Sequence, residues 1–151
     1  MVLMRRYIVP GATYFVTTNI RDNRFSYRDP FHAEELTRLI YRYRGKGDFD
    51  LLGFVVMPDH LHLVVVPQSG VTISQIMNRI KTSEAKRLVA AGFRPPIWWR
   101  RYYDRMMRDE DMLLATLNYI HENPVRKEIV ENAEEYTFSS ANPQWETDFT
   151  K

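Results

Sequence analysis

Residues 49–67 read FDLLGFVVMPDHLHLVVVP, and this stretch decides which architecture the rest of the chain can join. Residues 49–57 and 61–66 are two apolar runs of strand length, separated by the turn-forming pair Pro58-Asp59. The spacing predicts an antiparallel hairpin with a tight connection. Neither run alternates cleanly between apolar and polar residues, so we expect both strands to be buried.

On the N-terminal side of this hairpin the sequence predicts one strand and one helix. Residues 14–20 (YFVTTNI) are β-branched and aromatic and follow the turn signal Pro10-Gly11, which indicates a strand. A helix is expected to begin at Pro30 and to end near Gly45 and Gly47. Its apolar stripe consists of Leu36, Leu39, Ile40 and Tyr43.

On the C-terminal side the sequence predicts a second helix and a fourth strand. Thr72 or Ser74 can cap this helix, and Gly92 with Pro95-Pro96 ends it. The aromatic stretch 97–107 (IWWRRYYDRMM) is expected to be the strand. The apolar stripe of the helix consists of Ile73, Ile76, Met77 and Ile80.

A third helix is predicted from the acidic cluster 109–111 to about Asn123, because acids favour a helix N-terminus and Pro124 disfavours a helical residue before it. The element order β, α, β, β, α, β, α is typical of an α+β fold, a ferredoxin-like split βαβ antiparallel sheet with an added C-terminal helix. We expect one domain over residues 1–151, with an ordered core from about residue 5 to residue 140 and a loose tail after it.

The composition excludes several classes of protein and site. The chain has 151 residues, 44% hydrophobic and 26% charged, as in an ordinary folded domain. It contains no cysteine, which excludes disulfides, thiolate zinc sites, iron–sulfur clusters and a cysteine nucleophile. Its apolar runs are far shorter than the roughly 18 residues of a membrane span, and the N-terminus lacks the apolar region of a signal peptide. We therefore expect a cytoplasmic protein without a membrane partner.

Positive charge is concentrated in the middle of the chain, although the net charge is only +2. Residues 76–108 hold nine Lys or Arg against two Asp or Glu, whereas residues 109–151 hold three against ten. Cations neutralise phosphates and aromatic rings stack on bases, so a basic segment rich in aromatic residues fits a nucleic-acid groove. A solvated basic helix beside buried aromatics has the same pattern.

The nucleic-acid hypothesis names particular side chains. The expected phosphate contacts are Arg79, Lys81, Lys86, Arg87, Arg100 and Arg101. The aromatic side chains expected to stack on bases are one or more of Trp98, Trp99, Tyr102 and Tyr103, with Trp98 and Tyr102 preferred. At most one of the two tryptophans is expected to face DNA, because neighbouring strand residues point to opposite faces. Arg5 and Arg6 are further candidate phosphate contacts.

Two histidines and one helix face carry the candidate chemistry. His60 and His62, at i and i+2 of a strand, point to the same face, where two imidazoles can hold one divalent cation. The plainer alternative is a pair of histidines bonded to their neighbours. On the third helix Tyr119 and Asn123 share a face beside the core stripe, whereas His121 points about 200° away from Tyr119. That core stripe consists of Leu113, Leu117 and Ile120. By itself such a tyrosine is more often a packing residue than a nucleophile.

Several segments together resemble one family of DNA-processing enzymes. MPDHLHLVVVP (57–67) is similar to the His-hydrophobic-His (HUH) motif of the single-tyrosine (Y1, IS200-like) transposases, and residues 108–140 resemble their tyrosine helix and the segment after it. RRYIVPGATYFVTTNI (5–20) and WWRRYYDRMMRDE (98–110) resemble the branch called REP-associated tyrosine transposases. The chain departs from many relatives at Arg105, where they have histidine.

The resemblance implies a fold, a reaction and a set of residues. It implies a ferredoxin-like core and a metal-dependent single-strand DNA endonuclease and strand transferase that cleaves and rejoins DNA, with hairpin-forming repeats as the expected substrate. His60, His62 and Asn123 would hold a divalent metal, Mg²⁺ or Mn²⁺. Tyr119 would be the nucleophile, forming a covalent 5′-phosphotyrosine intermediate and a free 3′-OH. The partner is single-stranded or hairpin DNA, and the oligomeric state, monomer or homodimer, stays open.

Two other functions remain compatible with the residues alone. A ferredoxin-like sheet can bind single-stranded nucleic acid without catalysis, as RRM domains do, but no RNP-like aromatic string stands in the predicted strands. A zinc-dependent hydrolase would use the two histidines and a carboxylate such as Asp59, but it lacks H-E-x-x-H, and we expect Asp59 on the opposite strand face. A covalent protein–DNA adduct that survives denaturation distinguishes the transposase from both.

Overall fold

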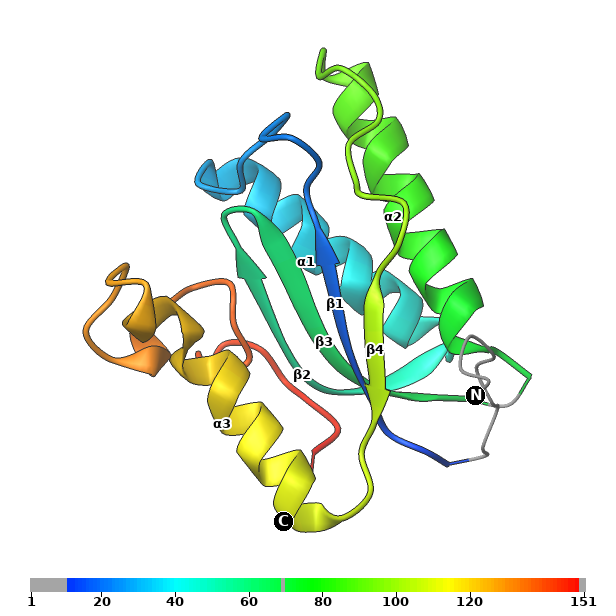
Figure 1. The fold of residues 1–151 in the computed structure, drawn as a ribbon, viewed down its shortest axis with the longest axis vertical. Coiled ribbons are helices and arrows are strands. Elements are labelled where there is room, and N and C mark those ends of the chain that lie inside the picture. Colours follow the sequence, from blue (N-terminus) through cyan, green and yellow to red (C-terminus); the bar gives the residue numbers. More distant parts are fainter. Residues whose placement is uncertain (1–10, 69, 150–151) are drawn as a thin grey trace.

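A computed structural model describes residues 11–68 and 70–149, which form a sheet with helices on both faces (Figure 1). The elements are β1 (Tyr14–Asn19), α1 (Pro30–Gly45), β2 (Phe49–Met57), β3 (His60–Pro67), α2 (Ile73–Ala90), β4 (Tyr103–Met106), α3 (Glu110–Arg126) and a short 3-10 helix, η1 (Ala133–Glu135). The predicted element order is confirmed.

The sheet is antiparallel throughout, with the strand order β2-β3-β1-β4. The predicted hairpin joins β2 to β3, and Met57 pairs with His60 across the Pro58-Asp59 turn. β1 lies between β3 and β4 although α1 and α2 separate these strands along the chain. This arrangement confirms the α+β, ferredoxin-like fold with an added C-terminal helix.

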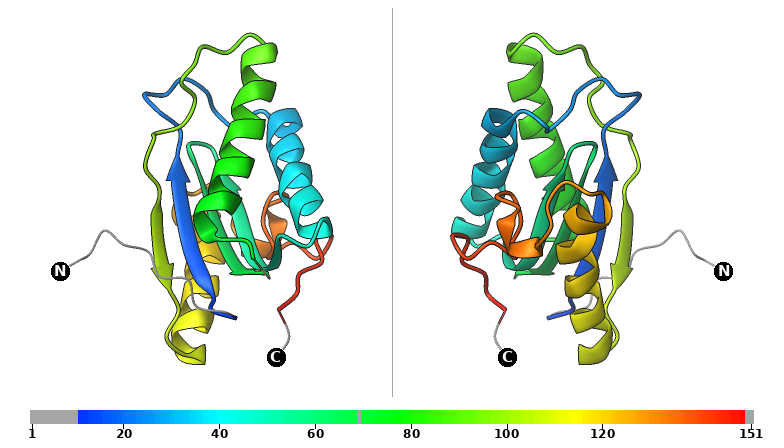
Figure 2. Two further views of the ribbon diagram at one scale, coloured as in Figure 1. Left: turned by 90° about the vertical axis from the view of Figure 1, so that its right-hand side faces the viewer. Right: turned by 90° about the vertical axis from the view of Figure 1, so that its left-hand side faces the viewer.

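Two cores lie on opposite faces of the sheet. α1 and α2 cover one face and α3 covers the other, as Figure 2 shows in its two side views. Successive residues of β3 alternate between these faces: Leu61 and Leu63 pack with α1 and α2, whereas Val64 packs with α3. His60 and His62 share the face of Val64, so the strand periodicity turns both imidazoles toward α3.

The helices begin where the sequence places their caps. The Asp29 carboxylate accepts a hydrogen bond from the first turn of α1. Thr72, not Ser74, caps α2, and it forms a reciprocal capping box with Gln75. Asp109 caps α3. No helix within the described residues is long and apolar enough to cross a membrane.

β4 is much shorter than the predicted strand of residues 97–107. It pairs regularly with β1 only from Tyr103 to Met106, and the next pairing toward its N-terminus is the isolated bridge between Trp98 and Ile20. Thr17 pairs with Tyr103, so β1 advances three residues between these two pairings while the partner segment covers five. The two extra residues must leave the ladder, and the strand therefore breaks.

α3 is longer than predicted, because it runs through Pro124 to Arg126. A proline removes the one helical hydrogen bond that its own N–H would donate. The next turn keeps its bonds, since the Lys127 N–H donates to the Asn123 carbonyl at 3.0 Å and the Glu128 N–H to the Val125 carbonyl. The rule that places a helix end before proline therefore fails here, because the turn after Pro124 keeps its hydrogen bonds.

The segment after Ser140, which we expected to be loose, is packed against α1 and β2. The Trp145 ring lies 5.4 Å from that of Tyr41, measured between centroids. The Arg44 guanidinium forms two hydrogen bonds of 2.8 Å with Asp148, whose main chain pairs with Leu51. These contacts join residues more than ninety positions apart, which local sequence patterns do not reveal.

Candidate active site and metal site

The two histidines of β3 stand side by side with their Nε2 atoms 3.1 Å apart. The outer nitrogen of each ring is held by a neighbour. The Asp59 carboxylate lies 2.7 Å from Nδ1 of His60, and the Thr17 hydroxyl lies 2.8 Å from Nδ1 of His62. A carboxylate at Nδ1 favours the proton on that nitrogen and leaves the Nε2 lone pair free for a cation. The pair is therefore oriented as metal ligands are.

His62 is buried, with 5% of its surface exposed. Burial, followed by electrostatic repulsion from the neighbouring His60 and Arg126, lowers the pKa of His62 to about 3. The imidazole is therefore neutral at neutral pH, which is the form that binds metals.

Asp59 lies in the turn before β3, where the alternation of a strand does not apply. The expectation that it faces away from the histidines was wrong, because its carboxylate contacts His60 directly. It contacts the outer nitrogen of the ring and not the side where the two Nε2 atoms converge. Asp59 thus orients His60, in the position that carboxylates occupy behind metal-bound histidines.

α3 brings an amide to the same point. The Asn123 side chain is buried, at 4% exposure, and its amide nitrogen lies 3.2 Å from Nε2 of His60. Rotating this amide by 180° would place its oxygen there instead, as a metal ligand. Among the described residues no three His, Cys, Asp or Glu side chains form a metal cluster, so a third protein ligand at this site would be the Asn123 amide.

Tyr119 lies one helical turn before Asn123, beside the histidine pair. Its ring centroid is 6.0 Å from that of His62, and 51% of its surface is exposed. The two rings line one pocket of about 560 Å³. A half-exposed tyrosine at the opening of a pocket does not fit the alternative of a core packing residue.

Arg126 holds the Tyr119 ring from the solvent side, and sequence reasoning missed it. Its guanidinium carbon lies 4.4 Å from the ring centroid, and the same group donates a hydrogen bond of 2.7 Å to the Tyr119 carbonyl. Residues seven apart lie within about 20° on a helix, so the spacing could have identified this contact. No sequence pattern predicts the contact between Thr17 and His62, because it depends on the register of β1 against β3.

His121 points away from the site, as the helix periodicity predicts. Its Nε2 atom lies 2.7 Å from the Ser140 hydroxyl. That hydroxyl in turn binds the backbone of Phe54 in β2. His121 therefore attaches the far side of α3 to the sheet and takes no part in the histidine pair.

Gly53 lets α3 approach the sheet closely enough for these side chains to meet. A Cβ atom built on Gly53 would lie 2.5 Å from a terminal methyl of Leu117 and 3.4 Å from one of Ile120. Real Cβ atoms do not approach this closely, so a larger residue must displace the buried Leu117 side chain or push part of α3 away from β2.

Gly53→Val is expected to lower the free energy of unfolding by about 1–3 kcal/mol, because it overpacks the interface between β2 and α3. It should also slow DNA cleavage, since Tyr119 and Asn123 move away from the histidines. Urea unfolding and a cleavage assay measure the two effects. Gly45→Val is the matched control, because no atom lies within 4 Å of a Cβ there. Equal behaviour of the two variants would contradict this role of Gly53.

The basic segment is partly exposed and partly used inside the fold. Lys86, Arg100 and Arg101 are exposed and form no ion pair with a described carboxylate. Lys81 donates to the carbonyls of Trp99 and Arg100. The Tyr102 hydroxyl lies 3.1 Å from that of Ser74.

Three of the predicted DNA contacts are engaged elsewhere. The Arg87 guanidinium binds the fully buried Glu84 at 2.7 and 2.9 Å, and Arg79 binds Asp48 at 2.7 Å. Trp98 is only 6% exposed and belongs to the core of α1 and α2, so its faces are closed to bases, whereas Trp99 is 45% exposed. As expected, one of the two tryptophans is buried and the other exposed, but the exposed one is Trp99 and not the preferred Trp98. Arg5 and Arg6 lie outside the described residues.

Comparisons with known proteins identify the family of this chain. The family model described as "Transposase IS200 like" matches residues 13–123, from the start of β1 to the candidate ligand Asn123. A protein of Escherichia coli (strain K12) named "REP-associated tyrosine transposase" is 28% identical over 137 residues, which cover 90% of this chain and 80% of that protein.

A solved structure resembles the whole chain. It is described as "Structure of the REP associates tyrosine transposase bound to a REP hairpin". The TM-score is 0.77, with 23% sequence identity over 100% of this chain and 92% of that one, a likeness that shows the shared fold. Since the family match also spans most of the sequence, this chain belongs to the IS200-like transposase family.

Proposed function

We propose that this protein is a metal-dependent single-strand DNA endonuclease and strand transferase, with Tyr119 as its nucleophile. The observation that carries the proposal is the convergence of two imidazole Nε2 atoms, the Asn123 amide and a half-exposed tyrosine between β3 and α3. Hairpin DNA with single-stranded flanks is the proposed substrate. The similar solved protein is bound to a REP hairpin, which supports this choice.

The residues present fit a divalent ion. His60, His62 and Asn123 would hold it, because nitrogen atoms 3.1 Å apart can both lie about 2.1 Å from one cation. Two neutral imidazoles and an amide leave the full positive charge of the ion uncompensated. Mg²⁺ or Mn²⁺ bound there would neutralise negative charge on the scissile phosphate.

The protein's own chemistry is a transesterification at phosphorus. The Tyr119 oxygen, after losing its proton to solvent, forms a bond to phosphorus as the bond to the 3′ oxygen breaks. The leaving oxygen takes the electron pair and a proton from water, which yields a free 3′-OH and a 5′-phosphotyrosine. Attack by a 3′-OH reverses the step and rejoins the strands without ATP, because one phosphodiester replaces another. Arg126, stacked on the ring, keeps the nucleophile oriented.

The two alternative functions have weaker support. An RRM-like binding module needs an open sheet face for stacking, but one face of this sheet is covered by α1 and α2 and much of the other by α3. A zinc hydrolase needs a carboxylate beside the Nε2 atoms, whereas Asp59 contacts Nδ1 of His60.

A covalent adduct assay tests the proposal. The protein is incubated with Mn²⁺ and hairpin oligonucleotides labelled at either end, and then denatured. A 5′-phosphotyrosine retains the 3′-terminal label on the protein and releases the 5′-terminal label as a free strand. Cleavage without any adduct would indicate a hydrolase, and binding without cleavage would indicate the non-catalytic module.

The exposed cations Arg100 and Arg101 are expected to contact phosphates. Replacing both with alanine should weaken DNA binding and reduce the slope of log K against log salt by about 0.7 to 0.9 for each phosphate that is no longer neutralised. Fluorescence anisotropy over a range of salt concentrations measures the slope. Arg38→Ala with Arg42→Ala is the control of equal charge, because these side chains lie on α1. If both double variants keep the same slope, the DNA groove lies elsewhere on the molecule.

A further inference from the structure

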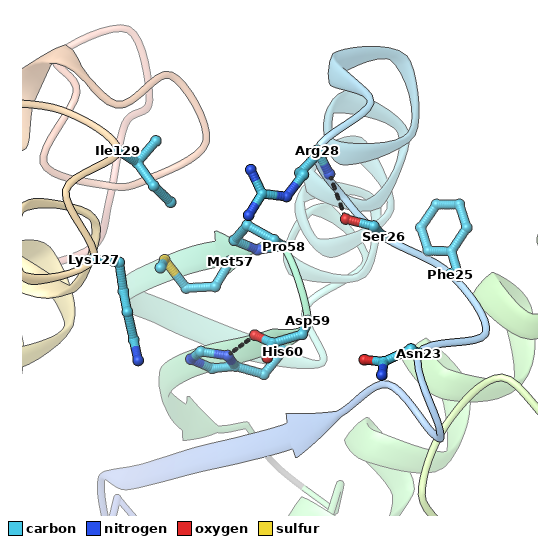
Figure 3. A pocket seen from close by; sticks show the side chains of 10 residues that line it. All are labelled: Asn23, Phe25, Ser26, Arg28, Met57, Pro58, Asp59, His60, Lys127 and Ile129. Atoms are coloured by element: carbon cyan, nitrogen blue, oxygen red, sulfur yellow. Dashed lines mark hydrogen bonds and ion pairs between the residues drawn. The ribbon is translucent and has the colours of Figure 1, made fainter.

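Two pockets flank the histidine pair, and the proposed chemistry uses only one of them. The first is the pocket of about 560 Å³ that contains Tyr119 and His62. The second has about 350 Å³ and is lined by His60, the Asp59 turn, the segment before α1 and the end of α3 (Figure 3). The two pockets share no lining residue. His60 lines the second pocket and His62 lines the first, and their Nε2 atoms are 3.1 Å apart, so both pockets border the same histidine pair.

The second pocket has the chemistry of an anion site. Arg28 and Lys127 both line it, and neither forms an ion pair with a described carboxylate. Asn23 adds an amide, and Figure 3 shows Lys127 and His60 facing the same space. The only described carboxylate in the lining is Asp59, which is engaged with His60. The pocket therefore combines two available cations with a hydrogen-bonding amide.

Ordinary structural roles explain one of these cations but not the other. Lys127 caps the C-terminal end of α3, where the helix dipole favours a positive charge without any ligand. Arg28 belongs to no helix or strand and is exposed. Its backbone N–H donates to the Ser26 hydroxyl at 3.2 Å, which orders the segment that carries it. A ligand in the pocket would give both side chains a partner.

The in-line geometry of the proposed reaction indicates which part of the DNA this ligand is. In a displacement at phosphorus the attacking and leaving oxygens lie roughly in line, on opposite sides of the phosphorus atom. Tyr119 attacks from the first pocket. Of the two pockets that border the histidine pair, this leaves the second, beside His60, for the leaving 3′ oxygen and its nucleotide.

We propose that the pocket of Asn23, Arg28 and Lys127 binds the last nucleotide of the leaving strand, with the two cations on the phosphate upstream of the cleaved one. This inference rests on the proposed function. A volume of about 350 Å³ is at the small end of ligand pockets and suits one nucleotide. The pocket would also retain the free 3′-OH beside the phosphotyrosine, where it can reverse the cleavage.

The first stage of the test obtains a substrate and examines the proposed function by itself. Wild-type protein and Mn²⁺ are incubated with a DNA hairpin whose single-stranded flanks are randomised, and the covalent adducts are recovered and sequenced. If the wild type forms no adduct, the proposed function fails and this inference fails with it.

The second stage measures the pocket through the rejoining reaction. Purified adducts of the wild type and of Arg28→Ala with Lys127→Ala are titrated with acceptor oligonucleotides that end in a 3′-OH. The double variant is expected to need at least about tenfold more acceptor for half-maximal rejoining, because it can no longer form two charge-assisted hydrogen bonds to the acceptor phosphate. The rate at saturating acceptor should stay near the wild-type value, since neither side chain touches the phosphotyrosine.

An equilibrium measurement in Tyr119→Phe protein separates this pocket from general attraction to DNA. Removing the two cations should weaken binding of the intact substrate about tenfold, but it should leave unchanged the binding of the downstream strand alone, which ends in a 5′-phosphate. Arg28→Lys with Lys127→Arg should restore binding, and Arg38→Ala with Arg42→Ala controls for the change in charge.

Two results would overturn the inference while leaving the proposed function intact. In the first, the double variant needs the same acceptor concentration as the wild type for half-maximal rejoining. In the second, the double variant loses equal affinity for the intact substrate and for the downstream strand. The folded state of the variants is checked by urea unfolding, in which these exposed side chains should cost little stability.

Discussion

Tyr119→Phe is expected to lower the rate of DNA cleavage by at least about 10³-fold and to abolish the covalent adduct, because it deletes the proposed nucleophile. The fold, metal binding and DNA binding should remain. The Tyr119 hydroxyl makes no hydrogen bond within the described residues, and a phenylalanine ring keeps the contacts with His62 and Arg126. Adduct formation, Mn²⁺ titration and DNA anisotropy measure the three properties separately.

Tyr136→Phe is the matched control. The Tyr136 hydroxyl donates a buried hydrogen bond to the Val56 carbonyl, and burial raises the pKa of Tyr136 to about 12. Removing this bond should cost about 1 kcal/mol of stability and leave cleavage unchanged. An adduct peptide that contains Tyr136 or Tyr103, or full activity of Tyr119→Phe, would refute the assignment of the nucleophile.

His60→Ala, or excess chelator, is expected to abolish cleavage by removing the metal from the site. Mn²⁺ affinity should fall together with the activity, and a calorimetric titration measures it without any turnover. In the wild type Mn²⁺ should bind more tightly than Mg²⁺, because imidazole suits the softer ion. His62→Ala should act in the same way, but it also leaves a cavity beside the Thr17 hydroxyl, so His60 gives the cleaner experiment.

His121→Ala is the control for these histidine variants. It removes the bond to Ser140 on the far side of α3 and should cleave normally, with a modest loss of stability. Asp59→Asn is an intermediate case, since it weakens the group that orients His60 and should reduce metal affinity about 10- to 100-fold. Normal cleavage by His60→Ala, or by the wild type in chelator, would disprove the metal site.

Much of the fold follows from local patterns in the sequence. The hairpin of residues 49–67, the apolar stripes of α1 and α2 and the Thr72 cap depend on residues only a few positions apart. Their periods and turn signals therefore specify them directly. The same applies to half of the site, because strand alternation turns His60 and His62 to one face.

For β4, Arg79 and the C-terminal segment, contacts distant in sequence decided the outcome. Two residues between Trp98 and Tyr103 leave the ladder with β1, so β4 is shorter than predicted. Trp98, before this break, lies in the core. The Asp48 carboxylate, 31 positions away in sequence, engages Arg79, and Asp148 attaches the C-terminal segment to Arg44. No periodicity within these segments carries information about partners tens of residues away.

The sequence by itself determined that two imidazoles share a strand face and that Tyr119 and Asn123 share a helix face. Only the tertiary structure decided that these two faces meet. Their meeting depends on the close approach of α3 at Gly53, on the register that sets Thr17 opposite His62, and on the Asp59 turn. Local periodicity fixes the direction of a side chain relative to its own backbone, whereas the distance between two side chains depends on how whole elements pack.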